Sequence, residues 1–265
     1  MPIIAFDLYG TLLSTDSIAA KLASSLGDDV PAGSSTALAA LWRRYQLEYT
    51  WRINNMGHYR PLNTITRASL HHAAAELGLT LSLPTNDNNN NNNDDVEEVM
   101  MAAYNALHVF PEVPAALEAI VTTQKKKGGL SDDSVVEAYL FSNGTRDMIA
   151  ASVGNSPDLL GMFSGKRVVV SVDEMEVPVY KPDQRAYEYL VREVGREGRP
   201  EEVWLVSANP FDALGAVAAG LRSVWVDRAG KGWVDRLGDV VGELRPTLVV
   251  SGVDEAVGEI MRMTA

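Results

Sequence analysis

The spacing of apolar positions divides the chain into two parts. In residues 16–107, apolar side chains recur every three or four residues, which is typical of amphipathic helices. From residue 137 onward, short apolar runs of strand length alternate with helical segments, and a first such run stands at residues 3–6. Regular alternation of strands and helices predicts a parallel sheet with helices on both faces. The helical part is then an insertion after the first strand.

The individual elements follow from this periodicity and from the turn residues that separate them. The expected helices of the insertion span residues 16–26, 35–56, 64–77 and 96–107. The other expected helices span residues 114–123, 183–194 and 254–261; one more begins near residue 146, and another follows residue 212 and ends at residue 219. The expected strands span residues 3–6, 138–141, 167–170, 203–206, 223–226 and 247–250. We therefore predict an α/β fold in which a Rossmann-like, three-layer core with a parallel sheet (residues 1–13 and 109–265) carries an inserted helical cap (residues 14–108).

Two polar tracts interrupt this pattern. Residues 85–95 are asparagine and aspartate apart from one threonine, and residues 125–133 are rich in lysine, glycine and aspartate. Tracts of this composition cannot bury apolar surface. We therefore expect both to form loops and the asparagine-rich one to be mobile.

Composition narrows the possible functions. The 265 residues carry 23 basic and 35 acidic side chains, a net charge of −12, which argues against binding to nucleic acid. The absence of cysteine excludes disulfides and thiolate chemistry. No apolar run approaches the ~20 residues that a membrane helix needs, and no signal peptide is visible before Asp7. We expect a cytoplasmic protein with no membrane partner.

Polar side chains follow three of the expected strands. Asp7 ends the first apolar run, Gly10 permits a tight turn, and Thr11 can hydrogen-bond the carboxylate. An aspartate in this position is a nucleophile, a metal ligand or the cap of a turn. The other two strands are followed by Ser142-Asn143 and by Ser207, Asn209 and Asp212. Because the carboxyl ends of parallel strands meet at one edge, we expect these side chains to share a crevice.

A fourth polar cluster, Tyr180-Lys181-Pro182-Asp183, opens an expected helix. Proline suits the first helical turn, so we place Pro182 there. Lys181 would then lie near the strand ends, where it would keep Asp7 ionised, although an isolated lysine is more often a solvated surface charge. The four histidines show no metal-binding spacing and are His58, His71, His72 and His108.

In their order these motifs resemble the haloacid dehalogenase superfamily, and within it the L-2-haloacid dehalogenases. The matching motifs are Asp7-x-Tyr9-Gly10-Thr11-Leu12, Ser142-Asn143-Gly144, Tyr180-Lys181-Pro182-Asp183 and Ser207-x-Asn209-x-x-Asp212. Residues 41–43 and 46–51 are similar to the first helix of the family's cap. The resemblance spans residues 3–216 and implies an active site between core and cap, and a homodimer.

The resemblance also implies a mechanism for converting short L-2-haloacids to D-2-hydroxy acids. Asp7 would attack the α-carbon and expel halide, leaving an ester on the enzyme. Lys181 would keep Asp7 ionised, and Arg43 would receive the halide or the substrate carboxylate. Asn209 and Asp212 would position and deprotonate the water that hydrolyses the ester. Neither a cofactor nor a metal ion is implied.

The remaining motif residues have supporting roles in this scheme. Thr11, Ser142 and Asn143 would orient the carboxylates, and Ser207 would orient Lys181. The residues expected to contact substrate are Tyr9, Arg43, Leu47, Ser142, Asn143, Tyr187 and Phe211.

Tyr9 favours one branch of the superfamily. The phosphatases have a second aspartate at this position, which protonates a leaving alcohol, and they bind Mg²⁺. A halide leaves without a proton, so a phenol here suits carbon–halogen cleavage. The alternatives are a phosphatase, a hydrolase of another small 2-substituted carboxylate, or a non-enzymatic binding protein. Departures from the family pattern bear on the substrate's side chain and stand at Arg44, Leu62, Ala208 and Phe211.

Overall fold

The six strands form one parallel sheet. The structure is a computed structural model that describes residues 2–26, 33–81, 96–126 and 136–264. The strands are β1 (Ile3–Phe6), β2 (Glu137–Ser142), β3 (Val169–Ser171), β4 (Val203–Ser207), β5 (Arg222–Val226) and β6 (Leu248–Val250). Their order is β3-β2-β1-β4-β5-β6, and every neighbouring pair is parallel. The predicted α/β fold with a parallel sheet is confirmed.

Strand β1 lies in the middle of this sheet because all four of its side chains are apolar. It pairs with β2 and β4, and each of its residues is fully buried. A strand covered on both faces reads as a continuous apolar run, as this one does. The first polar residue, Asp7, therefore emerges at the carboxyl edge between the ends of β2 and β4.

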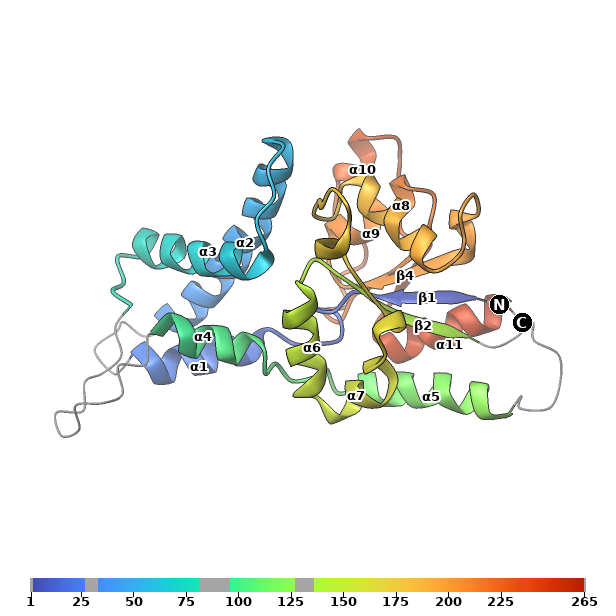
Figure 1. The fold of residues 1–265 in the computed structure, drawn as a ribbon, viewed down its shortest axis with the longest axis horizontal. Helices are drawn as coiled ribbons and strands as arrows, with labels where there is room; N and C mark the ends of the chain where they lie inside the picture. Colours follow the sequence, from blue (N-terminus) through green and yellow to red (C-terminus); the bar gives the residue numbers. More distant parts are fainter. Residues whose placement is uncertain (1, 27–32, 82–95, 127–135, 265) are drawn as a thin grey trace.

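Helices cover both faces of the sheet (Figure 1). On one face lie α5 (Val113–Lys126), α7 (Pro157–Phe163) and α11 (Val253–Thr264), and on the other lie α8 (Gln184–Glu193) and α9 (Pro210–Ala218). Helix α6 (Arg146–Gly154) follows β2, and the short α10 (Leu237–Val240) precedes β6. The result is the predicted arrangement of three layers.

The remaining helices form a separate group, here called the helical group, beyond the carboxyl ends of the strands (Figure 1). Its members are α1 (Asp16–Leu26), α2 (Ser34–Asn55), α3 (Leu62–Glu76) and α4 (Val96–Tyr104). The two connections to the sheet run side by side, since Ser14 N donates to His108 O over 2.8 Å and Phe110 N to Leu12 O over 3.0 Å. Among the described helices, none combines the length and apolar character needed to cross a bilayer.

Several expected boundaries are wrong. The strand expected at 167–170 starts later, because residues Lys166–Val168 form a 3-10 turn before β3. Helices α7 and α10 were not expected, since each is short and lies between turn residues. Pro182 is not in the first turn of α8: the Asp183 carboxylate accepts from Arg185 N over 3.0 Å and caps the helix one residue further on. The asparagine-rich tract 85–95 and residues 127–133 lie outside the described residues.

Candidate active site

A buried lysine bridges two aspartates at the carboxyl edge of the sheet. Lys181 Nζ donates to Asp7 Oδ1 over 2.9 Å and to Asp212 Oδ2 over 2.7 Å. Its third hydrogen bond goes to the carbonyl of Phe141, over 3.0 Å. The side chains of Lys181 and Asp212 are only 1% and 0% exposed. The ammonium thus has all three donors satisfied inside the protein.

The charge states of this cluster depend on burial and on mutual interaction. Burial alone would lower the pKa of Lys181, but the carboxylates of Asp212 and Asp7 together raise it above its ordinary value, so the lysine is a cation. Burial raises the pKa of Asp212, and Lys181 opposes that rise. Asp212 is therefore a stronger base than an exposed aspartate, while its charge is still balanced by the ammonium.

Asp7 is held by two further donors. Its Oδ2 accepts from Thr11 Oγ1 over 2.8 Å and from Asn209 Nδ2 over 2.7 Å. Thr11 Oγ1 itself accepts from Ala208 N over 2.9 Å, so the loops after β1 and β4 are joined at this point. With Lys181 on Oδ1, the carboxylate has one fixed orientation. Asn209, which was expected to position water, thus also donates to Asp7.

Above Asp7 lies a small pocket of about 340 Å³, including its open mouth. It is lined by Asp7, Tyr9, Arg43, Gln46, Leu47, Thr50, Leu62, Ser142, Asn143, Lys181, Asn209 and Phe211. The sheet side supplies the carboxylate and its donors, whereas α2 and α3 supply the guanidinium and apolar walls. A guanidinium facing a carboxylate between apolar walls suits a small substrate with an anionic group.

Arg43 reaches this pocket from α2. Its Nη2 lies 3.3 Å from the carbonyl oxygen of Tyr9 and 3.5 Å from Asn209 Oδ1. The adjacent Arg44 is exposed, so the departure from the family pattern there lies outside the pocket. Of these two arginines, Arg43 is the one that lines the pocket beside Asp7.

The side chain of Tyr9 points away from Asp7. Its hydroxyl lies 3.3 Å from Ser152 Oγ, and its ring packs against Tyr104 with centroids 5.1 Å apart. Burial raises the pKa of the Tyr9 phenol well above its ordinary value. The ring forms part of the pocket wall, but the hydroxyl is not placed to protonate a leaving group.

Three residues do not make the contacts expected of them. Ser142 Oγ accepts from Gly144 N over 3.0 Å, and Asn143 Oδ1 accepts from Lys181 N over 2.9 Å, so each is bonded to backbone rather than to a carboxylate. Ser207 Oγ accepts from Asn209 N over 3.1 Å and has no bond to the Lys181 ammonium, whose donors are already satisfied. All three therefore shape the loops that carry the charged groups.

Tyr187 lies behind Asp212 instead of in the pocket. Its hydroxyl donates to Asp212 Oδ1 over 2.8 Å, and its side chain is fully buried. Gly215 makes this possible, because a Cβ there would lie 2.3 Å from the Tyr187 hydroxyl. The expected substrate contact is thus wrong, and Tyr187 instead orients the second carboxylate.

The donor set does not fit a hard divalent cation. The space between the two carboxylates is filled by the Lys181 ammonium, and Mg²⁺ requires an octahedron of oxygen ligands. Within the described residues, no three histidine, aspartate or glutamate side chains gather as possible metal ligands.

Sequence reasoning missed four residues around the site. Gln46 and Thr50 line the pocket, and both belong to a buried stripe on α2 that also includes Leu38 and Trp42. Two polar residues that continue the spacing of Leu38 and Trp42 were the available signal. Tyr104 contacts Arg43 from α4. Arg228 Nη2 donates to Thr11 O over 2.7 Å and pairs with Glu112, which no motif indicated.

The fold and the site together define an α/β protein with a parallel sheet and a buried, ion-paired carboxylate at the end of its first strand. A family model described as haloacid dehalogenase-like hydrolase matches residues 1–220, and the chain belongs to this family. The family predicted from the motifs is thus confirmed.

Several proteins that are similar to this chain are named L-2- or (S)-2-haloacid dehalogenases. The chain is 32% identical to (S)-2-haloacid dehalogenase of Pseudomonas sp. (strain YL), over 86% of this chain and 83% of that protein. A solved L-2-haloacid dehalogenase is similar with a TM-score of 0.75 and 25% identity, over 98% of each chain. The L-2-haloacid dehalogenase from Xanthobacter autotrophicus with chloropropionic acid covalently bound gives a TM-score of 0.73 and 26% identity, over 100% of each chain.

Proposed function

We propose that the protein hydrolyses short L-2-haloacids to D-2-hydroxy acids and halide through an ester on Asp7. The observation that carries this proposal is the environment of Asp7. A fixed, ion-paired carboxylate faces the Arg43 guanidinium across a small pocket, while Tyr9, the neighbour that would have to act as acid for an alcohol leaving group, turns its hydroxyl to Ser152. A halide leaves as an anion and needs no proton.

In the first step a carboxylate oxygen of Asp7 attacks the α-carbon from the side opposite the halogen. The new C–O bond forms as the carbon–halogen bond breaks, and the bonding pair leaves with the halide. Arg43 offers planar N–H donors to the halide or to the substrate carboxylate. Attack from the rear inverts the α-carbon, so an L substrate gives a D product.

In the second step water attacks the carboxyl carbon of Asp7. Asp212 takes the proton, since it is the other carboxylate beside the Lys181 ammonium and burial raises the pKa of its carboxyl. The bond between the Asp7 carboxyl carbon and the hydroxy-acid oxygen then breaks, and that oxygen takes the proton held by Asp212 as the hydroxy acid leaves. Asp7 regains two oxygens, one of them from water, and becomes a carboxylate again when its remaining proton passes to solvent. No bond to the α-carbon breaks in this step, so the configuration is inverted once over the whole reaction. The Lys181 ammonium pairs with both carboxylates, and neither step of the proposed reaction uses a metal ion.

We also propose that residues 14–108, which include the helical group, form a cap on a core formed by residues 1–13 and 109–265. The side-by-side connections at Ser14–His108 and Leu12–Phe110 support this division. The resulting cleft receives the haloacid and releases halide, and cap motion would control the entry of water. A cytoplasmic location and a homodimer are further predictions from the sequence.

The test is halide release from the separate enantiomers of 2-chloropropionate with EDTA present. We expect chloride and D-lactate from the L enantiomer and nothing from the D enantiomer, with activity abolished in Asp7→Ala. The proposal fails if the L enantiomer releases no chloride while a phosphate monoester is hydrolysed in a Mg²⁺-dependent reaction.

A single-turnover reaction in ¹⁸O-labelled water tests the ester separately. With enzyme in excess, the label should enter the Asp7 carboxylate and be missing from the lactate, because water attacks the enzyme's carboxyl carbon. Label in the lactate of the first turnover would show direct attack of water on the substrate and overturn the ester step.

A further inference from the structure

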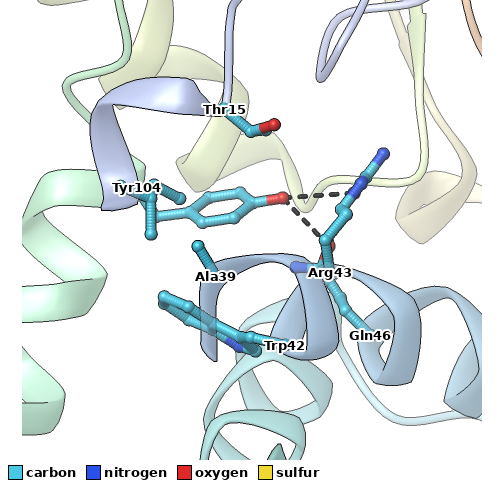
Figure 2. Close-up of a pocket in the computed structure, with 7 residues that line it drawn as sticks. Thr15, Ala39, Trp42, Arg43, Gln46 and Tyr104 are labelled. Atoms are coloured by element: carbon cyan, nitrogen blue, oxygen red, sulfur yellow. Dashed lines mark hydrogen bonds between the residues drawn. The ribbon is translucent and has the colours of Figure 1, made fainter. Parts of the chain in front are cut away.

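Arg43 is held by a buried amide one helical turn away. Gln46 is 1% exposed, and its Oε1 accepts from Arg43 Nη1 over 2.6 Å. The same oxygen accepts from the Tyr104 hydroxyl over 2.9 Å, and that hydroxyl lies 3.3 Å from Arg43 Nη1 (Figure 2). Nη1 of the guanidinium is therefore hydrogen-bonded to side chains of α2 and α4, and Nη2 remains available to the pocket.

The orientation of the Gln46 amide is set by α3. Gln46 Nε2 donates to Thr66 Oγ1 over 2.7 Å, and Thr66 Oγ1 donates in turn to the carbonyl of Leu62 over 2.7 Å. Because the Thr66 proton is used by Leu62, its oxygen is left to accept from the amide. A reversed amide would turn N–H groups toward the guanidinium and leave two donors facing each other. The hydroxyl of Thr66 thus selects the amide orientation that supports Arg43.

We propose that Gln46 is a positioning residue that pre-organises Arg43 for its anionic ligand, with Thr66 fixing the amide. This inference rests on the proposed function of Arg43. A long arginine side chain loses much rotamer freedom when it binds an anion, and a partner that orders it beforehand reduces that cost. The bonds from Nη2 to Tyr9 and Asn209, at 3.3 and 3.5 Å, are long and can be exchanged for a halide or a carboxylate.

The main test is Gln46→Met, which keeps the length of the side chain and removes its hydrogen bonds to Arg43, Tyr104 and Thr66. We expect kcat/KM for L-2-chloropropionate to fall about tenfold to a hundredfold, the range for losing a hydrogen bond to a charged group. Bromide, a product-like inhibitor, should bind at least tenfold more weakly. In an Arg43→Lys background, Gln46→Met should have no further effect, because it acts through the guanidinium. Wild-type bromide affinity in Gln46→Met overturns the proposal.

Substitutions of Thr66 on α3 test the same inference in case Gln46→Met does not fold. Thr66→Val should weaken bromide binding in the same direction, and Thr66→Ser, which retains the hydroxyl, should restore it. Ser69→Ala is the matched control, because it removes a buried hydroxyl of the same helix that donates only to the carbonyl of Thr66, over 3.0 Å. Equal loss in Thr66→Val and Thr66→Ser would contradict the role assigned to the hydroxyl.

The bromide titration, followed by calorimetry, separates this inference from the proposed reaction. If the wild-type protein binds bromide but releases no chloride from 2-chloropropionate, the proposed function fails while the titrations still decide the role of Gln46. If the wild-type protein binds neither bromide nor D-lactate, both proposals are overturned.

Discussion

Lys181 and Asp212 form an ion pair that is withdrawn from solvent, with Nζ and Oδ2 2.7 Å apart and both side chains buried. The same ammonium lies 2.9 Å from Asp7. One cation therefore balances two carboxylates, one of which is Asp7, the proposed nucleophile. Buried charges of this kind are tolerated only when they are paired and hydrogen-bonded.

Removing the lysine should abolish activity and make stability depend on pH. In Lys181→Met, Asp212 loses the ammonium that lowers its pKa and still faces the Asp7 carboxylate, so the folded-state pKa of Asp212 rises further above that of the unfolded chain. A carboxyl with a raised folded pKa binds more protons in the folded state, so stability is lost as pH rises through that pKa. We expect a loss of about 3–5 kcal/mol near pH 8 and a smaller loss near pH 5. Urea denaturation at both pH values measures this.

The matched control for that prediction is Lys231→Met, since Lys231 is exposed. It should retain activity and the stability of the wild-type protein at both pH values. Equal destabilisation of Lys181→Met near pH 5 and pH 8 would contradict the coupling between Asp7 and Asp212.

The motif residues of this cluster were found from the sequence because each directly follows a strand or precedes a helix. The order of short strands places their carboxyl ends together, so Asp7, Asn209 and Lys181 were expected to meet although they lie far apart in the chain. The roles of Ser207 and Tyr187 were wrong, since their partners depend on side-chain direction within the folded loops. Hydrophobic periodicity predicts which face of a helix is buried, but it does not predict which groups the side chains on that face contact.

The hydrogen bonds that hold Arg43 could not be predicted from the sequence for the same reason. Gln46 meets Thr66 and Tyr104 only because α2, α3 and α4 pack together, and the pattern of each helix alone does not fix that contact. Arg228 likewise reaches the Asp7 loop from the segment after β5, over 217 residues of chain. Such contacts between distant segments follow from the tertiary structure.

Tyr187→Phe should move the acid limb of the kcat profile to higher pH. In the proposed second step Asp212 must be ionised to take a proton from water, and its pKa is raised by burial and lowered by the hydrogen bond from Tyr187. Without the phenol the pKa rises further, so the fraction of ionised Asp212 falls at a given acidic pH. We expect kcat near neutral pH to change less than kcat near pH 5.

This profile is measured as chloride release from L-2-chloropropionate at saturation. Tyr189→Phe is the control, because Tyr189 lies on the same helix and packs against Arg192, with the guanidinium carbon 5.1 Å from the ring centroid. The role given to Tyr187 is wrong if its variant has the acid limb of the wild-type enzyme.

Asn54 should hold the helical group against the loop that carries Lys181. Its Nδ2 donates to Tyr180 O over 2.6 Å, and its Oδ1 accepts from Tyr180 N over 3.0 Å. One side chain thus satisfies both backbone groups of the residue before Lys181. Asn54→Ala should lose about 1–3 kcal/mol of stability and about tenfold in kcat/KM, since two partly buried backbone groups lose their partner.

Thermal unfolding and steady-state kinetics measure these two losses. The control is Asn55→Ala, because Asn55 is adjacent and exposed. If both variants behave alike, the bonds between Asn54 and Tyr180 do not position the loop.

Leu62 should limit the size of the substrate's side chain. It is buried at the start of α3 and lines the pocket together with Leu47 and Phe211, whose ring packs edge-on against Trp51 with centroids 5.4 Å apart. Leu62→Ala opens space for about one more methylene group, which is worth roughly tenfold or more in discrimination. We expect the ratio of kcat/KM for L-2-chlorobutyrate to that for L-2-chloropropionate to rise by about this factor. The ratio is taken within one variant, so a loss of stability from the buried leucine does not affect it. Leu77→Ala, at the exposed end of the same helix, should leave the ratio unchanged, and an unchanged ratio in Leu62→Ala would place the substrate's side chain elsewhere in the pocket.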